Sequence, residues 1–191
     1  MSFLRGLNGV IALMGRAPSG NFPNFFGEAK TAFHNSLTAI GGSVLLILIL
    51  TRSIIHLQRR AAKDAADASI PVLQIGITAA FYLLAFTLIA FMLSLIFDRR
   101  EEYFRWATLR HWVVFYALMP VTLVAVLATA GIFPIVLANG LLFTAFIGWL
   151  FVDIRLAYKM GGLGFIGAVF AACMTHALGL SIILTAVVQM I

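Results

Sequence analysis

One titratable residue lies deep inside an apolar stretch near the end of the chain, and it is the first candidate for chemistry. His176 follows Cys173 by about one helical turn. An ionisable side chain inside a membrane helix is a functional candidate by default, as a haem ligand, a metal ligand or a proton relay. A bis-histidine haem needs a second histidine at a similar depth, and His34, His56 and His111 all lie near the ends of apolar stretches. A neutral histidine that is hydrogen-bonded to a neighbouring helix is the simpler interpretation, and the one we prefer.

The residue patterns of familiar catalytic centres are absent from the sequence. It contains no His-x-x-x-His pair, no phosphate-binding loop and no serine-centred elbow. No apolar stretch carries an acidic residue at mid-depth, so an ion-coupled pump would lack its usual carboxylate. The single cysteine, Cys173, excludes an internal disulfide and a multi-cysteine metal site. We therefore expect a protein that is not an enzyme and that has no cofactor and no metal site.

Small residues recur every four positions in the C-terminal stretch. This spacing lets the backbones of two helices approach closely. One stripe could pack inside the protein while the other meets a partner, and internal packing of both stripes is the alternative. The stripes are Gly164, Ala168 and Ala172, and Gly167, Ala171, Thr175 and Gly179.

Basic and aromatic side chains gather in segment 98–110, and further charges follow the next long apolar stretch. Arginine and tryptophan side chains of this kind favour the membrane–water interface. Asp153 and Arg155 are two positions apart and do not share a helix face, but each could pair with segment 98–110; a surface or lipid-headgroup role is the preferred alternative. The predicted interfacial or lipid-facing residues are Arg99, Arg100, Arg105, Trp106, Arg110 and Arg155.

The elements that must position these residues are apolar helices. The chain has 191 residues, of which 62% are hydrophobic and 10% charged, the profile of a polytopic membrane protein. The longest apolar stretch carries no Asp, Glu, Lys or Arg from His111 to Val152, which is enough for two spans of about 20 residues. Gly131 and Pro134 divide it into a helical hairpin. We expect a single all-α membrane domain, 1–191, with five transmembrane helices at 37–57, 72–97, 112–130, 135–152 and 163–190.

The first residues are predicted to form an amphipathic helix in the membrane interface. Apolar side chains recur at helical spacing over residues 2–15, while Arg5 and Asn8 fall outside that stripe. A disordered tail is the alternative.

The distribution of Lys and Arg predicts the orientation. With five spans, the side that holds the N-terminus and segments 98–110 and 153–161 carries nine of the 13 Lys and Arg residues. The positive-inside rule then places the N-terminus in the cytoplasm, in a bacterial inner membrane, and the C-terminus outside. The basic segment 59–63 opposes this orientation, unless the first apolar stretch dips into the membrane without spanning it.

The layout resembles that of a known class. An amphipathic N-terminus, the approach to the first span at Phe33–Ser36 (Phe-His-Asn-Ser), five spans, and the close of the fourth at Trp149–Arg155 (Trp-Leu-Phe-Val-Asp-Ile-Arg) carry the resemblance. In these features the chain resembles small uncharacterised alphaproteobacterial membrane proteins, which in turn resemble the five-span Yip (Ypt-interacting protein) class. The resemblance implies a cytoplasmic N-terminus and a scaffold or membrane-organising role without a cofactor.

These observations favour a non-enzymatic accessory or scaffold subunit of a larger membrane complex. Its partners would be other membrane-protein subunits and membrane lipids, anionic lipids included, rather than nucleic acid. One alternative is a small transporter or channel component, in which the helix breaks at Pro120 and Asn139-Gly140 line a path. The other is a haem-binding electron-transfer subunit, which depends on His176 alone.

Overall fold

The computed structural model describes residues 3–15, 28–62 and 72–190, and the regular elements among them are all helices. The predicted all-α class is therefore confirmed for this part of the chain. In order, the elements are α1 (Phe3–Met14), α3 (Ala29–Ala62), α4 (Val72–Ile96), the short 3-10 helix η2 (Arg100–Glu102), α5 (Tyr103–Thr129), α6 (Ile135–Lys159) and α7 (Phe165–Met190).

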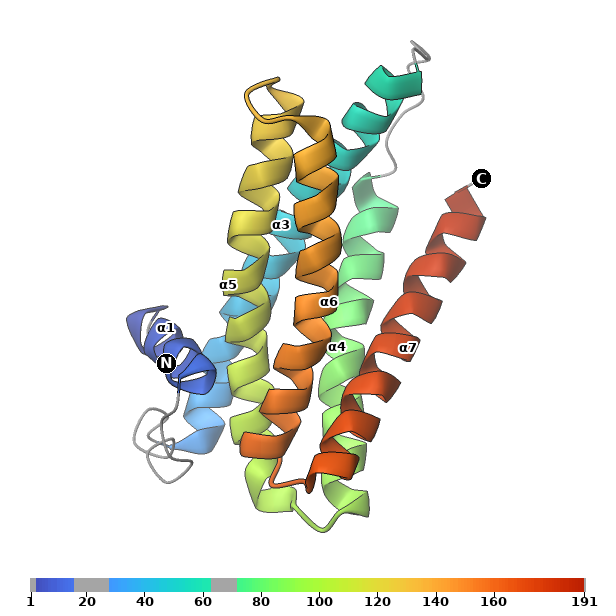
Figure 1. Cartoon of the computed structure of the whole chain (residues 1–191). Helices are drawn as coiled ribbons and strands as arrows, with labels where there is room; N and C mark the ends of the chain where they lie inside the picture. Colours follow the sequence, from blue (N-terminus) through green and yellow to red (C-terminus); the bar gives the residue numbers. More distant parts are fainter. Residues whose placement is uncertain (1–2, 16–27, 63–71, 191) are drawn as a thin grey trace.

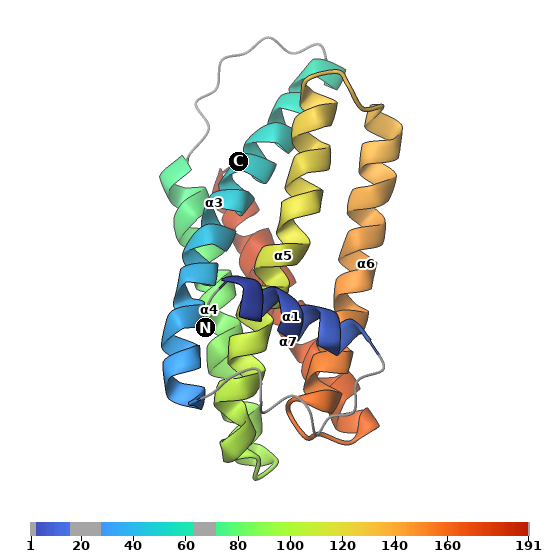
Figure 2. The same ribbon diagram turned by 90° about the vertical axis from the view of Figure 1, so that its left-hand side faces the viewer.

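The long helices run side by side as a bundle, and α1 lies across it (Figures 1 and 2). Within the described part of the chain, four helices are long and apolar enough to cross a membrane. A helix of 25 residues is about 37 Å long, which exceeds the roughly 30 Å of a hydrocarbon core. In α7 the apolar segment that the structure describes, Phe165–Gly179, is shorter than a membrane span, so the fifth span stays a prediction. The four candidate spans, by residue range, are Ala29–Leu57, Val72–Ile96, Arg100–Thr129 and Ile135–Lys159.

The predicted hairpin is present, formed by α5 and α6. Gly131 adopts a φ of +77°, a left-handed conformation that glycine enters without steric cost. The N–H groups of Ile132 and Phe133 both donate to the carbonyl of Leu127, at 3.0 and 3.2 Å, which ends α5. Pro134 has an extended backbone and precedes the first residue of α6. The turn therefore forms at the predicted residues, Gly131 to Pro134.

The helices extend beyond the predicted spans at their charged ends. Helix α5 begins at Tyr103 rather than Trp112, and α6 ends at Lys159 rather than Val152. Helix α3 likewise extends beyond both ends of segment 37–57, whereas α4 matches the predicted 72–97 within one residue. The hydropathy boundary marks where the apolar side chains end, but nothing there interrupts the backbone hydrogen bonds of the helix.

Helix α1 confirms the helix predicted over the first residues, and it packs across α5 and α6. Its Gly6 lies so close to α5 that an added Cβ would be 2.6 Å from the Trp112 ring. At its other end, Arg155 of α6 donates to the carbonyls of Leu13 and Gly15, and Lys159 also donates to Gly15. Cations at a helix C-terminus are favoured by the helix dipole. Its position in the membrane interface remains a prediction.

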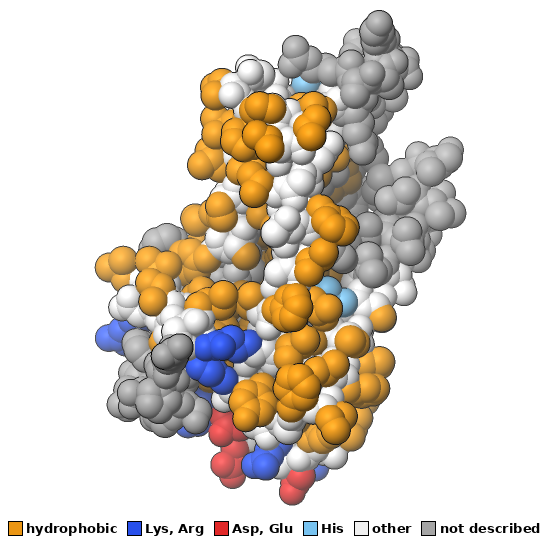
Figure 3. Space-filling model, viewed as in Figure 1, with side chains coloured by type: hydrophobic (Ala, Val, Ile, Leu, Met, Phe, Trp, Pro, Cys, Tyr) orange, Lys and Arg blue, Asp and Glu red, His pale blue; other side chains and the backbone are white. Residues whose placement is uncertain are grey.

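Among the described residues, the largest buried cluster lies where α1 and α3–α7 meet, toward the end of the bundle that carries η2. Figure 3 shows acidic and basic side chains gathered at this end, which we call the base, below a surface on which hydrophobic side chains predominate. The cluster is built from large apolar side chains and from alanines that allow close helix approach. It includes Leu13, Phe86, Trp106, Leu109, Leu156, Ala168 and Ala171.

Candidate functional site

A buried ion pair joins the two helices of the hairpin. The Arg110 guanidinium of α5 donates from Nε to Oδ1 of Asp153 at 3.0 Å and from Nη2 to Oδ2 at 3.1 Å. The two side chains are only 1% and 3% exposed. A bidentate pair is among the strongest charge-assisted interactions, and buried charges require such geometry because leaving water is costly.

Helices α4 and α7 complete the surroundings of this pair. The Phe86 ring lies 3.8 Å from the guanidinium carbon of Arg110, as a cation–π contact. The hydroxyl of Tyr82 also interacts with Arg110. From α7, His176 Nδ1 lies 3.7 Å from Asp153 Oδ2, so the four helices α4–α7 converge on one charged centre, which we define as Arg110, Asp153 and His176.

The hydrogen bond of His176 indicates which ring nitrogen carries a proton. Its Nδ1 lies 3.0 Å from the carbonyl oxygen of Ala172, one turn earlier in α7. A carbonyl only accepts hydrogen bonds, so Nδ1 carries the proton, and Nε2 is the acceptor when the ring is neutral. The sequence favoured a histidine that is hydrogen-bonded to a neighbouring helix, whereas this bond lies within α7 and the neighbouring helix α6 contributes the carboxylate of Asp153 at 3.7 Å. Among the described residues no three metal-ligating side chains come together.

A second polar centre, which the sequence analysis missed, surrounds His111. Ser36 Oγ donates to the carbonyl of Phe33 at 2.7 Å, so it accepts from His111 Nδ1 at 2.8 Å. The Thr87 hydroxyl then donates to His111 Nε2 at 3.0 Å. In this assignment the serine hydroxyl donates to the backbone rather than to the histidine, whereas a nucleophile would donate to its base. The centre instead ties α3, α4 and α5 together.

This arrangement also bears on the haem hypothesis. A bis-histidine site needs two imidazole nitrogens that face one space. Both ring nitrogens of His111 are used by Ser36 and Thr87, whereas His176 lies beside Asp153. The structure therefore does not bring these two histidines together as axial ligands.

The prediction that Trp106 and Arg110 face the interface or lipid is wrong. Trp106 and Arg110 are buried, with 2% and 1% exposure, because each has a partner inside the bundle. The Trp106 ring packs edge-on against Phe86, with 5.9 Å between the ring centres, and Arg110 binds Asp153. Of the alternatives that the sequence left open for Asp153, pairing with segment 98–110 is the one observed.

The other predicted interfacial residues lie at the base or beside α1. Arg99 and Arg100 are exposed, and Arg105 pairs with Glu102 at 3.4 Å with about a third of each side chain exposed. Arg155 does not pair with segment 98–110, because it binds the end of α1 instead. Their contact with lipid headgroups stays a prediction.

Most members of the two small-residue stripes are buried in the protein, although Gly164, which precedes α7, is exposed. Helix α7 lies against α4 on one side and α6 on the other, so each stripe already has a neighbour. At Gly179, an added Cβ would collide with the Tyr82 ring, whereas Gly164 faces open space. Internal packing, rather than a partner-facing stripe, is what the structure shows for the buried members Ala168, Ala171, Ala172 and Thr175.

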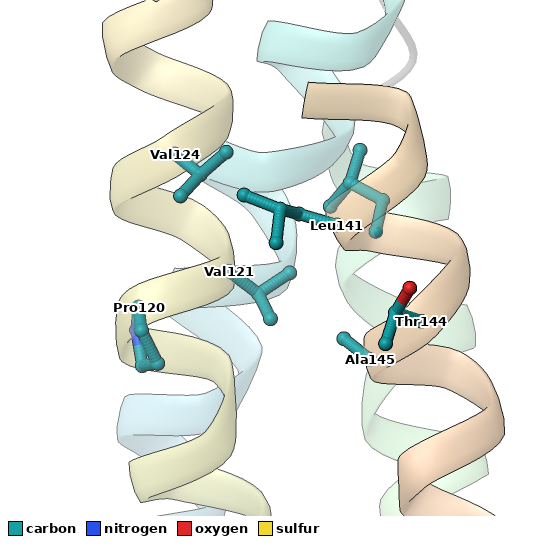
Figure 4. Close-up of a pocket in the computed structure, with 7 residues that line it drawn as sticks. Pro120, Val121, Val124, Leu141, Thr144 and Ala145 are labelled. Carbon is teal, nitrogen blue, oxygen red and sulfur yellow. The ribbon is translucent and has the colours of Figure 1, made fainter. Parts of the chain in front are cut away.

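An apolar groove runs between α5 and α6 (Figure 4). It consists of two adjoining hollows of about 300 and 260 Å³. Pro120 lines both, as the sequence suggested for a helix break, but Asn139 and Gly140 do not line either. The lining residues are Val113, Ala117, Pro120, Val121 and Val124 of α5, and Leu141, Leu142, Thr144, Ala145, Gly148, Trp149 and Val152 of α6.

Comparison with protein-family models, with curated proteins and with solved structures finds no match for this chain. The resemblance to Yip-type proteins stays a prediction. The features of the molecule that bear on its function are the ion pair, the His111 centre, the groove and the exposed faces of the helices.

Proposed function

We propose that this chain is a non-enzymatic integral membrane protein that serves as an accessory or scaffold subunit of a larger membrane complex, in a bacterial inner membrane with its N-terminus in the cytoplasm. The observation that supports the proposal is the outer face of α6. This helix packs against α5, α7 and the end of α1, and several of its large apolar side chains remain exposed.

The outer face has a small residue among large ones. A Cβ added at Gly140 would meet nothing within 4 Å. Large exposed side chains flank this position, so a second helix could bring its backbone close to Gly140 while packing against its neighbours. The exposed side chains of this face are Val136, Leu137, Phe143, Ile147 and Phe151.

The polar centres support a structural role over a catalytic one. Arg110 and Asp153 satisfy each other, and His111 is bound on both ring nitrogens. A catalytic group needs an accessible reacting atom beside its partner, and these groups are buried and already paired. They suit a rigid support whose outer surface binds partner subunits.

The test compares two glycines that both face open space. Gly140→Leu on α6 should release partner chains during purification in mild detergent, because the added side chain prevents close helix approach. Gly41→Leu on α3 is the matched control, since a Cβ there also meets nothing within 4 Å. A wild-type protein that purifies without partner chains, or a Gly140→Leu variant that keeps all of them, would overturn the proposal.

A proton-linked transporter component is the second candidate, and the charged centre is the observation in its favour. Ionisable groups inside a membrane bundle often carry protons or ions. It ranks second because Arg110 occupies both oxygens of Asp153. Proton flux through reconstituted vesicles that is lost in Asp153→Asn, with the protein still folded, would reverse this order.

A further inference from the structure

The polar contacts inside the bundle lie in one layer, at the level of α1. The His111 centre joins α3, α4 and α5, and the charged centre joins α5, α6 and α7. The two centres lie at one level because Arg110 and His111 are adjacent in α5. Helix α1 crosses the bundle at the same level, where Gly6 lies close to the Trp112 ring. This level, which we call the polar layer, gives the long helices a common reference height.

Between the polar layer and the end of the base, α4 and α7 are apolar. Helix α4 continues from Thr87 to Ile96, and α7 begins at Phe165, before His176, so each extends about 15 Å from the layer toward the base. These stretches contain no Asp, Glu, Lys or Arg. The two helices are neighbours, so they form one side of the base. Its exposed side chains include Leu88, Met92 and Ile96 of α4, and Phe165, Ile166 and Phe170 of α7.

The other side of the base is polar over the same distance. Helix α3 exposes Lys30, Thr31 and His34 there, and α6 carries Arg155 and Lys159 beside the end of α1. Figure 3 shows basic side chains near α1 at a higher level than the lowest hydrophobic side chains below α7, on the opposite side. The boundary between charged and apolar surface is therefore not level around the bundle but slants from α1 down to the start of α7.

The apolar side of the base continues directly into the outer surface of a candidate membrane span. Helix α4 exposes Leu73, Phe81, Leu88 and Ile96 in turn, and it carries no charge before Asp98. A surface patch for a water-soluble partner would begin beyond a polar boundary, and α4 has none. Its 25 residues are about 37 Å long, which exceeds the roughly 30 Å of a hydrocarbon core. Tilting is the usual way in which such a helix stays within lipid.

We propose that the α4–α7 side of the base is embedded in the acyl chains of the leaflet at the base, while the α1 side lies among the lipid headgroups at the same height, so that the bundle crosses the membrane at a slant. The membrane surface then follows α1 on one side of the bundle and lies near Asp98, after the end of α4, on the other. This inference rests on the proposed membrane location, but it does not depend on a partner at the outer face of α6.

Spin labels at two positions of equal height test the proposal. Met92 lies five positions beyond Thr87 on α4, Thr31 lies five positions before Ser36 on α3, and both are exposed. Met92→Cys and Thr31→Cys, each in a Cys173→Ala background, would carry a nitroxide in protein reconstituted into liposomes. Collision with oxygen reports acyl chains, and collision with a water-soluble nickel chelate reports water. The label on α4 should collide mainly with oxygen, and the label on α3 mainly with the nickel chelate.

Three other outcomes would overturn the proposal. Two labels in the acyl chains would mean an upright bundle whose base is inside the membrane on all sides. Two labels in water would mean that the apolar side of the base stands outside the membrane, as a surface for a soluble partner. Release of the whole protein from membranes by alkaline carbonate would instead refute the membrane location itself, on which the slant depends.

A matched pair of lysine variants gives a second readout. Phe170 of α7 and Tyr158 of α6 lie beyond the polar layer toward the base, and they are 51% and 55% exposed. Because a charge within acyl chains is costly, Phe170→Lys should reduce the amount of protein recovered in membranes, whereas Tyr158→Lys should not. Phe170→Leu keeps the position apolar and should behave like the wild type, which separates the charge from the loss of the ring. Equal recovery of the two lysine variants would contradict the proposal.

Discussion

At the scale of single residues, Arg110 and Asp153 show how an apolar bundle can hold two charges. Their bidentate contact and the Phe86 ring replace the water that each group leaves. Such a pair adds little net stability compared with apolar side chains of the same size. It matters because neither partner tolerates the loss of the other, so it selects one arrangement of α5 against α6.

Asp153→Asn should destabilise the protein by about 3–5 kcal/mol, because Arg110 then remains buried without a counter-charge. The double change Arg110→Met with Asp153→Leu should recover most of that loss. Thermal unfolding in detergent, monitored by circular dichroism, measures both effects. A single variant as stable as the wild type would mean that Arg110 has another adequate anionic partner.

The sequence identified some of these residues but not their partners. It singled out His176 because that side chain lies far inside an apolar stretch, and it noted that Asp153 could pair with segment 98–110. It placed Arg110 at the interface, because hydropathy treats a charge next to an apolar run as a boundary. His111 was set aside for the same reason, although Ser36 and Thr87 supply its bonds from 75 and 24 residues away.

At the scale of elements, two neighbouring glycines of α3 show how closely helices approach here. A Cβ on Gly42 would lie 2.5 Å from the Phe115 ring of α5, whereas one on Gly41 would meet nothing within 4 Å. Gly42 is needed for the close packing of α3 on α5. Gly41 is exposed and has space for a side chain.

Gly42→Ala should lower stability by about 1–3 kcal/mol, the usual cost of forcing a methyl group into packed side chains. Gly41→Ala should leave stability unchanged or raise it by up to about 1 kcal/mol, because alanine is the better helix former. The comparison needs only the two melting temperatures in one detergent. Equal effects of the two changes would show that α3 does not pack on α5 in this register.

The helices themselves could be predicted, because apolar composition and the Gly131–Pro134 break are local properties of the chain. Their ends at the base could not. Tyr103 begins α5 and Lys159 ends α6, inside segments whose charges suggested loops, because the partners of those charges lie on other helices or on α1. The sequence also could not predict which sides of α7 contact other helices of the chain, since residue spacing alone does not distinguish an internal neighbour from an external one.

At the scale of the whole molecule, the charged base and the uncharged hairpin turn define opposite ends of the bundle. The base carries exposed charges around η2, and the turn at 130–134 contains none, although α3 has Arg59 and Arg60 near its C-terminal end, on the side of the turn. This asymmetry is the physical basis for the predicted orientation, because positive charge resists transfer across the membrane.

Cysteine labelling in a Cys173→Ala background tests that orientation. A cysteine in place of Glu101, which is exposed at the base, should react only from the cytoplasmic side. A cysteine in place of Ile132, which is 72% exposed in the hairpin turn, should react only from outside. Reaction of both positions from one side would contradict a hairpin that crosses the membrane.

The ion pair between α5 and α6 also has a consequence for biosynthesis. Asp153 follows Arg110 by 43 residues, so the whole of α5 is synthesised before its counter-charge. We expect α5 to settle fully only when α6 arrives, which makes the hairpin, and not the single helix, the unit of insertion. Nascent chains that stop at residue 145 should therefore insert α5 less completely than chains that stop at residue 165, by protease protection. Arg110→Leu should remove the difference.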